Sequence, residues 1–206
     1  MKAIIIGNAE FNKDEKFGTL IDEFDFVYRI NRYRVETFEE NLGSKTSIWL
    51  TNRNLPMNNC AYPFDFQKQF KARKKASPDL ETAMIVSYFK NYPEFYPIRD
   101  WTKKHDNVII ANTISISEYV RNEWSKVVTE KFYKPATGIL SILYLIEEYG
   151  EICIHNFDNA KTNHYFEDKN QNPQAQPQKA KHVWNFDKKM IKRLIEEKKI
   201  KYLKDL

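Results

Sequence analysis

Short apolar runs bounded by turn residues recur along the chain, and they predict the strands of a mostly parallel sheet. The first run covers residues 3–6 and is followed at once by Gly7 and Asn8, as at the start of many nucleotide-binding α/β domains. Further runs with a strand-like pattern cover residues 24–30, 46–50, 108–111 and 151–154. We therefore expect the first strand to point at a ligand near Gly7 and Asn8.

Two other stretches have the apolar spacing of helices. Residues 139–149 form an apolar-rich stretch that ends at Gly150 and leads into the strand predicted at 151–154, which completes half of a βαβ unit. Residues 186–206 predict a Lys-rich amphipathic helix followed by a short strand-like segment. Residues 60–104 are aromatic and interrupted by prolines, and the pattern assigns no element there.

Length, composition and charge bound the class of protein. With 206 residues, 42% of them hydrophobic, and no internal repeat, the chain has the size of one α/β domain covering residues 1–206. The net charge of +5 suits nucleic acid, an anionic membrane surface or a negatively charged nucleotide. Apart from clusters at 71–75 and 188–204 the basic residues are dispersed, with no zinc-finger or aromatic RNA-binding signature, so we expect no nucleic-acid partner.

The cysteines and the apolar stretches predict a compartment. Cys60 and Cys153 lack metal-ligand spacing and the density of a disulfide scaffold, which favours a reducing environment. No apolar stretch has the length of a signal peptide or a membrane span. We expect a cytoplasmic protein. The Lys-rich helix at 186–206 could place it against the anionic inner membrane, although a solvated helix face is the simpler explanation.

Four short blocks occur in order along nearly the whole chain outside residues 52–134. They are Ile6-Gly7-Asn8 continuing through Gly18, Ile21-Asp22, Asp25, Val27, Arg29 and Asn31 to Gly43-Ser44-Lys45-Thr46; Pro135-Ala136-Thr137-Gly138; His164-Tyr165-Phe166-Glu167; and His182-x-x-x-x-Asp187. At these spacings they resemble the large, small, third and last motifs of the family 29 sialyltransferases. The resemblance implies a single-domain modified Rossmann-like fold with a central, mostly parallel sheet flanked by helices. It also implies an enzyme that moves sialic acid from CMP-sialic acid to a glycan hydroxyl with inversion.

By this resemblance, Gly7, Asn8, Asn31, Thr137 and Gly138 bind the donor nucleotide. An amide both donates and accepts hydrogen bonds, which suits ribose and phosphate oxygens. Thr137 and Gly138 stand where a helix begins, so main-chain N–H groups and the helix dipole would face the nucleotide. Plainer roles exist for these residues: Asx turns after each strand for the asparagines, and a helix N-cap for Thr137.

Two of the four histidines lie in the matching motifs, and two do not. His182 matches the histidine proposed as general base in the family, and an imidazole is suited to taking a sugar hydroxyl proton near neutrality. His164 matches the histidine that contacts the donor phosphate, with Tyr165 as its support and a further donor-site residue. We assign His105 and His155 to the ordinary surface.

Three expectations concern the surroundings of the site. Residues 168–181 are almost entirely polar and predict a flexible loop that is either a lid over bound donor or a simple tether. The sequence offers no convincing Asp-x-Asp or histidine cluster, so we expect neither a metal nor another cofactor. Arg29 is either a donor ligand or part of a salt bridge between the first two strands.

The chain also departs from the family pattern. Ala3 and Tyr149 occupy the positions of the disulfide in animal members, which suggests a bacterial version. The small motif carries Ala136 in place of its usual serine, Lys134 replaces a tyrosine and Asn156 a glycine. These changes leave open CMP-Kdo as the donor for a bacterial surface polysaccharide, or a non-catalytic module that binds nucleotide or polyanion. Residues 52–134 are the expected acceptor side, and the sequence leaves the oligomeric state open.

Overall fold

A computed structural model describes residues 1–52, 66–87, 102, 103, 105–127, 135–158, 165 and 184–206. Its strands are β1 (Ala3–Ile6), β2 (Phe26–Ile30), β3 (Ile48–Thr51), β4 (Thr82–Ile85), β5 (Val108–Ile110), β6 (Ile152–His155) and β7 (Ile200–Tyr202). Its helices are α1 (Gly18–Asp22), α2 (Glu39–Leu42), α3 (Phe66–Ala76), α5 (Ile114–Val127), α6 (Thr137–Tyr149) and α7 (Trp184–Glu196), followed by the 3-10 turn η1 (Leu203–Asp205).

The seven strands form one sheet in the order β5-β4-β3-β2-β1-β6-β7, and every neighbouring pair is parallel. In the centre of the sheet Ile4 lies between Val27 of β2 and Cys153 of β6. Because all strands run the same way, their carboxyl ends share one edge. The predicted α/β architecture with a parallel sheet is confirmed.

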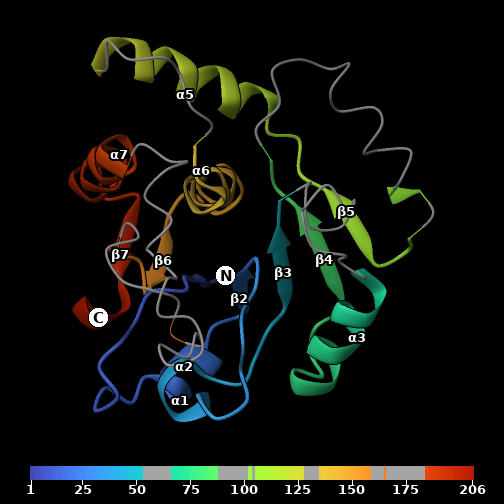
Figure 1. The fold of residues 1–206 in the computed structure, drawn as a ribbon. Coiled ribbons are helices and arrows are strands. Elements are labelled where there is room, and N and C mark those ends of the chain that lie inside the picture. The colour runs from blue at the N-terminus through green and yellow to red at the C-terminus, as the bar shows by residue number, and fades with distance from the viewer. Residues whose placement is uncertain (53–65, 88–101, 104, 128–134, 159–164, 166–183) are drawn as a thin grey trace, which may run out of the picture.

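Helices cover both faces of this sheet (Figure 1), with α5, α6 and α7 on one side and α1, α2 and α3 on the other. Alternating strand residues supply the two cores. On β1, Ile5 belongs to the cluster that packs under α6 and α7, whereas Ile4 and Ile6 belong to the cluster with Ile21 and Leu42 of α1 and α2. The strands are buried on both faces, which explains their continuous apolar runs.

All five strands predicted from apolar runs are present, and α6 begins at Thr137, two residues before the predicted helix. The C-terminal prediction of a helix followed by a strand corresponds to α7 and β7. Sequence patterns missed α3 and β4, which lie in the aromatic stretch that received no assignment, and also α5. In α3 the mean hydropathy is low because lysines fill the outer face, so its buried residues Phe66, Phe70 and Arg73 form too sparse a pattern to be recognised.

The lysines of α7 lie on its outer side. Its buried residues Phe186, Met190, Ile191 and Leu194 join the core. Lys192 pairs with Glu196 at 3.6 Å, and Arg193 pairs with Glu123 of α5 at 2.8 Å. This arrangement fits an ordinary solvated face, and contact with a membrane surface stays a prediction. Within the described ranges, no helix has both the length and the apolar character needed to cross a bilayer.

Apolar and aromatic packing occupies the positions of the animal disulfide. Ala3 is buried in the main core, and Tyr149 at the end of α6 packs against the same cluster. The Tyr149 hydroxyl lies 2.7 Å from the Tyr28 hydroxyl, and its ring lies 5.9 Å from that of Phe26. Cys153 is a free, buried thiol on β6, and Cys60 lies outside the described residues.

Arg29 and Asp22 organise the turn between α2 and β3. The Arg29 side chain is fully buried and donates hydrogen bonds to the carbonyls of Leu42 and Gly43 at 2.7 and 2.9 Å, as well as to residues 45 and 46. Asp22 accepts hydrogen bonds from the Ser44 and Lys45 main-chain N–H groups, both at 2.9 Å. The salt bridge predicted between the first two strands is therefore wrong, because the partners of this guanidinium among the described residues are carbonyl oxygens of the turn and the Thr46 hydroxyl rather than an acid.

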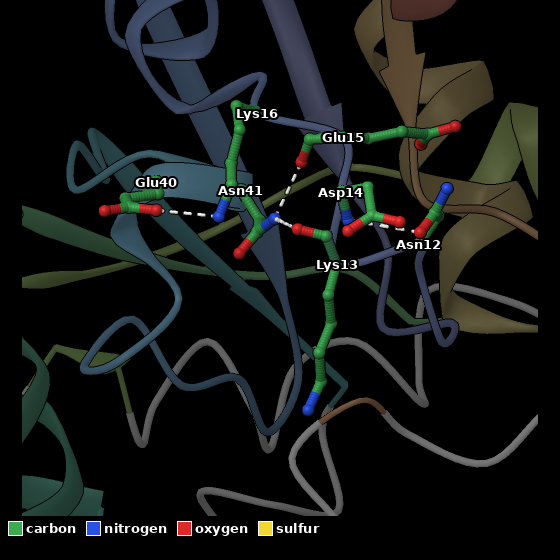
Figure 2. Close-up of polar contacts among 7 residues, drawn as sticks. All are labelled: Asn12, Lys13, Asp14, Glu15, Lys16, Glu40 and Asn41. Carbon is green, nitrogen blue, oxygen red and sulfur yellow. Dashed lines mark hydrogen bonds and ion pairs between the residues drawn. The ribbon is translucent and has the colours of Figure 1, made fainter.

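The segment after β1 is fastened to α2 by side chains (Figure 2). The buried Asn41 amide donates to the carbonyl of Lys13 at 2.9 Å and to that of Glu15 at 2.7 Å. On the outside, Lys16 pairs with Glu40 at 2.7 Å, where both side chains are largely exposed. These contacts hold the connection between Asn8 and α1 against the body of the protein.

These two attachments should differ in strength. Asn41→Ala leaves two carbonyls without their donors, so we expect the free energy of unfolding to fall by roughly 1–3 kcal/mol. The matched control Lys16→Ala removes only the exposed ion pair and should leave the stability nearly unchanged. Urea unfolding of the two variants measures both effects, and equal losses in the two would contradict this account.

Candidate active site

The chain reverses direction in the sheet between β1 and β6. From β1 it proceeds outward through β2, β3 and β4 to β5, then returns to β6 on the other side of β1. At such a switch point the connections leave the strand ends in opposite directions, which opens a crevice at the carboxyl edge. Four adjacent strands each end in an asparagine at this edge: Asn52 after β3, Asn31 after β2, Asn8 after β1 and Asn156 after β6.

Asn8 ties the end of β1 to the end of β2. Its side-chain nitrogen donates to the carbonyls of Ile30 and Arg32, each at 2.9 Å. Its side-chain oxygen has no hydrogen-bond partner among the described residues. These partners lie 22 and 24 residues away along the chain, so the bonds are not those of an Asx turn. One acceptor of this amide is therefore unused within the described part of the chain.

Gly7 permits the close approach of β1 to the segment after β6. Its N–H donates to the His155 carbonyl at 2.9 Å, and a Cβ atom at this position would lie 2.3 Å from the Asn156 carbonyl oxygen. Asn156 has a left-handed φ of 60° and donates from its side chain to the Ala9 carbonyl at 2.5 Å. The asparagine that replaces the family glycine thus keeps a glycine-like conformation and adds a link to the turn after β1.

Asn31 stands at the same edge in a left-handed conformation, with a φ of 50°. Its N–H donates to the Leu50 carbonyl at 2.7 Å, and its own carbonyl accepts the indole N–H of Trp49 at 2.6 Å. The side-chain oxygen accepts longer contacts of 3.4 and 3.5 Å from Asn52. The main chain at Asn31 is therefore firmly held, whereas its side chain is more weakly engaged.

The amino end of α6 lies against this edge. A Cβ atom on Gly138 would meet the Phe157 ring at 3.0 Å and Ile30 at 3.7 Å, which places the first turn over the ends of β6 and β2. Ala136 is the N-cap and forms no side-chain cap hydrogen bond, so the N-cap role considered for Thr137 is wrong. Thr137 is instead the first helical residue. The first N–H groups of a helix lack partners within it and favour anions.

Asp187 ties α7 to this helix end. The carboxyl group is 3% exposed, accepts a hydrogen bond from the Ala136 N–H, and has one oxygen without a partner among the described residues. Burial raises the pKa of Asp187 to about 7, against the lowering effect of that hydrogen bond. The motif match identified Asp187 but gave it no role; here it joins the start of α7 to the N-cap of α6.

Tyr165 is anchored next to Asn8. Its main-chain N–H donates to the Asn8 carbonyl at 3.1 Å, and its hydroxyl bonds to both the N–H and the carbonyl of Arg34. Its ring packs on Phe11 and Phe38, with ring centroids 5.6 and 5.0 Å away. Tyr165 therefore holds the third motif against the turn after β1.

The structure describes two of the four histidines, His105 and His155. His155 is 9% exposed and packs edge-on against Phe17, so its assignment to the surface is wrong. Burial, with the positive charge of Arg29, lowers the pKa of His155 to about 4 and keeps it neutral. His105 is partly buried near the amino edge of the sheet, 2.8 Å from Gln67. His164, His182 and the lid predicted at 168–181 lie outside the described residues.

The part of the chain that the structure describes contains no group of three or more His, Cys, Asp or Glu side chains placed to hold a metal ion. The polar groups at the carboxyl edge are amides, main-chain N–H groups and one buried carboxyl. Such groups suit a ribose and a phosphate, since both offer several hydrogen-bond acceptors.

The buried Asp187 carboxyl should make stability depend on pH. Between the ordinary pKa of 3.8 and about 7 the unfolded chain releases a proton that the folded chain keeps. The contribution of this group to stability is therefore complete below 3.8 and is lost as pH rises through about 7. Asp187→Asn keeps an acceptor for the Ala136 N–H but does not titrate, so its stability should not fall in this way. We therefore expect the stability of the variant relative to wild type to rise by on the order of 2 kcal/mol between pH ~4 and ~8.

Chemical denaturation of wild type and variant across this pH range measures the difference. Asp205→Asn is the control, because Asp205 is exposed at the chain end and its replacement should leave the pH dependence unchanged. Parallel stability curves for wild type and Asp187→Asn would show that the carboxyl is not held protonated by its surroundings.

Relatives among known proteins match most of this chain. The pig and chicken enzymes named CMP-N-acetylneuraminate-beta-galactosamide-alpha-2,3-sialyltransferase 1 are 26% and 22% identical over 84% and 98% of the chain. The chain spans about half the length of these relatives, 49% and 58% respectively. A shorter stretch, 27% of the chain, is 34% identical to the beta-1,6-galactosyltransferase GALT29A of Arabidopsis thaliana and covers 14% of it.

Solved structures share the fold. A mammalian sialyltransferase in complex with Gal-beta-1-3GalNAc-ortho-nitrophenol superimposes with a TM-score of 0.63 and 18% identity, over 98% of this chain and 68% of that one. The sialyltransferase CstII of Campylobacter jejuni in complex with cytidine-5'-monophosphate superimposes with a TM-score of 0.63 and 15% identity, over 98% of this chain and 79% of that one. The model of glycosyltransferase family 29 (sialyltransferase) matches residues 1–199. Because that match covers nearly the whole chain, the chain belongs to glycosyltransferase family 29.

Proposed function

We propose that this protein is a CMP-sugar-dependent glycosyltransferase that moves sialic acid from CMP-sialic acid onto a hydroxyl of a glycan, with inversion. The observation that carries the proposal is the meeting of Asn8, Asn31 and the start of α6 at the switch point of the sheet. The names of the pig and chicken relatives, and the CMP bound in a structure of the same fold, support this donor.

The nucleotide would be held by groups that are already in position. The partnerless side-chain oxygen of Asn8 would accept a hydrogen bond from a ribose hydroxyl or a base amine. The first N–H groups of α6, at Thr137 and Gly138, would donate to the phosphate. Gly138 is suited to such an approach because it has no side chain to shield the main chain from the ligand.

In the transfer step, an acceptor hydroxyl oxygen attacks the anomeric carbon of the donor from the side opposite the phosphate. The new glycosidic bond forms as the bond between that carbon and the phosphate oxygen breaks, and CMP leaves with the electron pair. The acceptor proton passes to His182, the proposed general base. His164 and the start of α6 would stabilise the charge on the departing phosphate. In this proposal no metal ion or other cofactor takes part.

The anchoring of neighbouring residues supports these two roles. His164 is bonded directly to Tyr165, and the N–H of that linkage donates to the Asn8 carbonyl at 3.1 Å. His182 precedes α7 by two residues, and Asp187 in the first turns of that helix bonds to the N-cap of α6. Described neighbours of both histidines, Tyr165 and Asp187, thus bond to residues at the proposed crevice, which supports the two roles.

The donor sugar is the open part of the proposal. CMP-Kdo is the principal alternative, since its 2-keto acid chemistry parallels that of sialic acid. The similarity to GALT29A, a protein named as a galactosyltransferase, favours testing an activated galactose as well. The acceptor side is proposed to lie within residues 52–134, whose aromatic and basic side chains suit acidic glycans.

The proposal is tested by donor turnover combined with replacement of the proposed base. CMP release from CMP-sialic acid and CMP-Kdo is measured over a panel of glycan acceptors, with an activated galactose as a third donor. With the accepted CMP-sugar, His182→Ala should lower turnover by roughly 100-fold or more and leave CMP binding close to that of wild type.

His105→Ala is the control, because His105 lies near the opposite edge of the sheet and should be dispensable. Full turnover in His182→Ala would contradict the assigned base. Wild-type protein that binds CMP but neither transfers nor hydrolyses either CMP-sugar would establish the non-catalytic module instead.

A further inference from the structure

A separate cavity of about 260 Å³ lies between the segment after β2 and helix α3. Its walls include Tyr33, Arg34 and Glu36 from that segment, and Gln69 and Arg73 from the helix. Residues 33–36 lie within the span of the first motif, but none of these residues is among its matching positions or in the proposed donor site.

Arg73 is held rigidly at this cavity. Its guanidinium lies 4.3 Å from the centre of the Trp49 ring and 5.1 Å from that of Tyr33. One terminal nitrogen donates to the main-chain and side-chain oxygens of Gln69 at 3.2 and 2.8 Å. The side chain is 9% exposed, and its Nε has no partner among the described residues. A positioned N–H donor therefore remains unused beside the cavity.

Tyr33 supplies a second unused donor. Its ring is 8% exposed, and its hydroxyl lies near the Thr46 side chain but has no partner within hydrogen-bond distance among the described residues. Burial raises the pKa of this phenol, so the hydroxyl keeps its proton. Because Tyr33 and Arg73 both line the cavity, two partnerless polar groups, each more than nine-tenths buried, border the same space.

The local charge is positive. The Arg29 guanidinium also lies against the Tyr33 ring, 5.8 Å from its centre, and neither Arg29 nor Arg73 forms an ion pair with a described residue. Arg34 and Glu36 are both exposed, so their charges largely offset one another. A buried guanidinium without an acidic partner is costly, and a bound anion would offset that cost.

We propose that this cavity binds a small oxyanion, a carboxylate, sulfate or phosphate group. Its oxygens accept hydrogen bonds from Arg73 Nε and the Tyr33 hydroxyl and lie beside the positive charge of Arg73. Guanidinium groups pair with such oxygens in a planar, two-point geometry, which lysine does not provide. The group arrives either as a free inorganic anion or as the acidic part of a sugar.

The site is connected to the donor edge through Trp49. Arg73 rests on the face of this indole, whose N–H donates to the Asn31 carbonyl at 2.6 Å. The two sites are nevertheless distinct, because Asn31 and Trp49 do not line the cavity. An oxyanion should therefore bind without displacing CMP.

Titration of wild-type protein with inorganic phosphate, sulfate and acetate, and with glucuronate as a carboxylate carried on a sugar, tests the proposal. Isothermal calorimetry should show saturable binding of at least one of them in the presence of saturating CMP, and the preferred ligand identifies the source. Arg73→Met should weaken that binding by roughly ten- to a hundredfold, because it removes a charged donor. Tyr33→Phe, which keeps the ring, should weaken it severalfold.

Lys71→Met is the matched control. It removes one positive charge from an exposed position on the same helix and should bind the anion as wild type does. Circular dichroism confirms the fold of each variant, and Tyr33→Phe keeps the test open if Arg73→Met does not fold. The proposal is overturned by any of three results: no saturable binding up to roughly 50 mM, equal loss in Lys71→Met and Arg73→Met, or displacement of the anion by CMP.

Discussion

The side-chain amide of Asn8 is the contact on which the arrangement of the candidate site depends. It joins the end of β1 to the end of β2 by two hydrogen bonds of 2.9 Å. The main-chain carbonyl of the same residue accepts a hydrogen bond from the N–H of Tyr165, which belongs to the distant third motif. One residue therefore fixes the spacing of two strand ends and the path of a segment far along the chain. Its remaining oxygen faces no protein partner among the described residues.

Three ionisable side chains do much of the positioning around this contact, and each bonds to main-chain atoms of a turn or helix end. Arg29 donates to carbonyls of the turn before β3. Asp22 accepts a hydrogen bond from an N–H group of that turn, and Asp187 accepts one from the N-cap of α6. Because main-chain groups are present whatever the neighbouring side chain is, Ala136 and Asn156 can replace the usual family residues without loss of this framework.

The parts of the fold that follow from local apolar pattern were predictable, and those that depend on long-range contacts were not. β1, β2, β6 and the helix ending at Gly150 could be predicted because their residues are buried on both faces or end in a distinct turn signal. The helix α3 was not predicted because one of its buried positions is an arginine, which reads as polar in the sequence. The burial of His155 was missed for a similar reason, since only the folded chain brings Phe17 against it. Motif order identified Asn8 and Asn31, but not the partners of their amides.

The central claim is that the carboxyl edge of the sheet, around the switch between β1 and β6, binds the nucleotide. Amide NMR of the protein titrated with CMP tests it directly, because signals move most where the ligand binds. The account predicts the largest shifts at Gly7, Asn8, Thr137, Gly138 and Asn156. Shifts concentrated instead at the amino edge, around Ser47, Glu81 and Asn107, would contradict it.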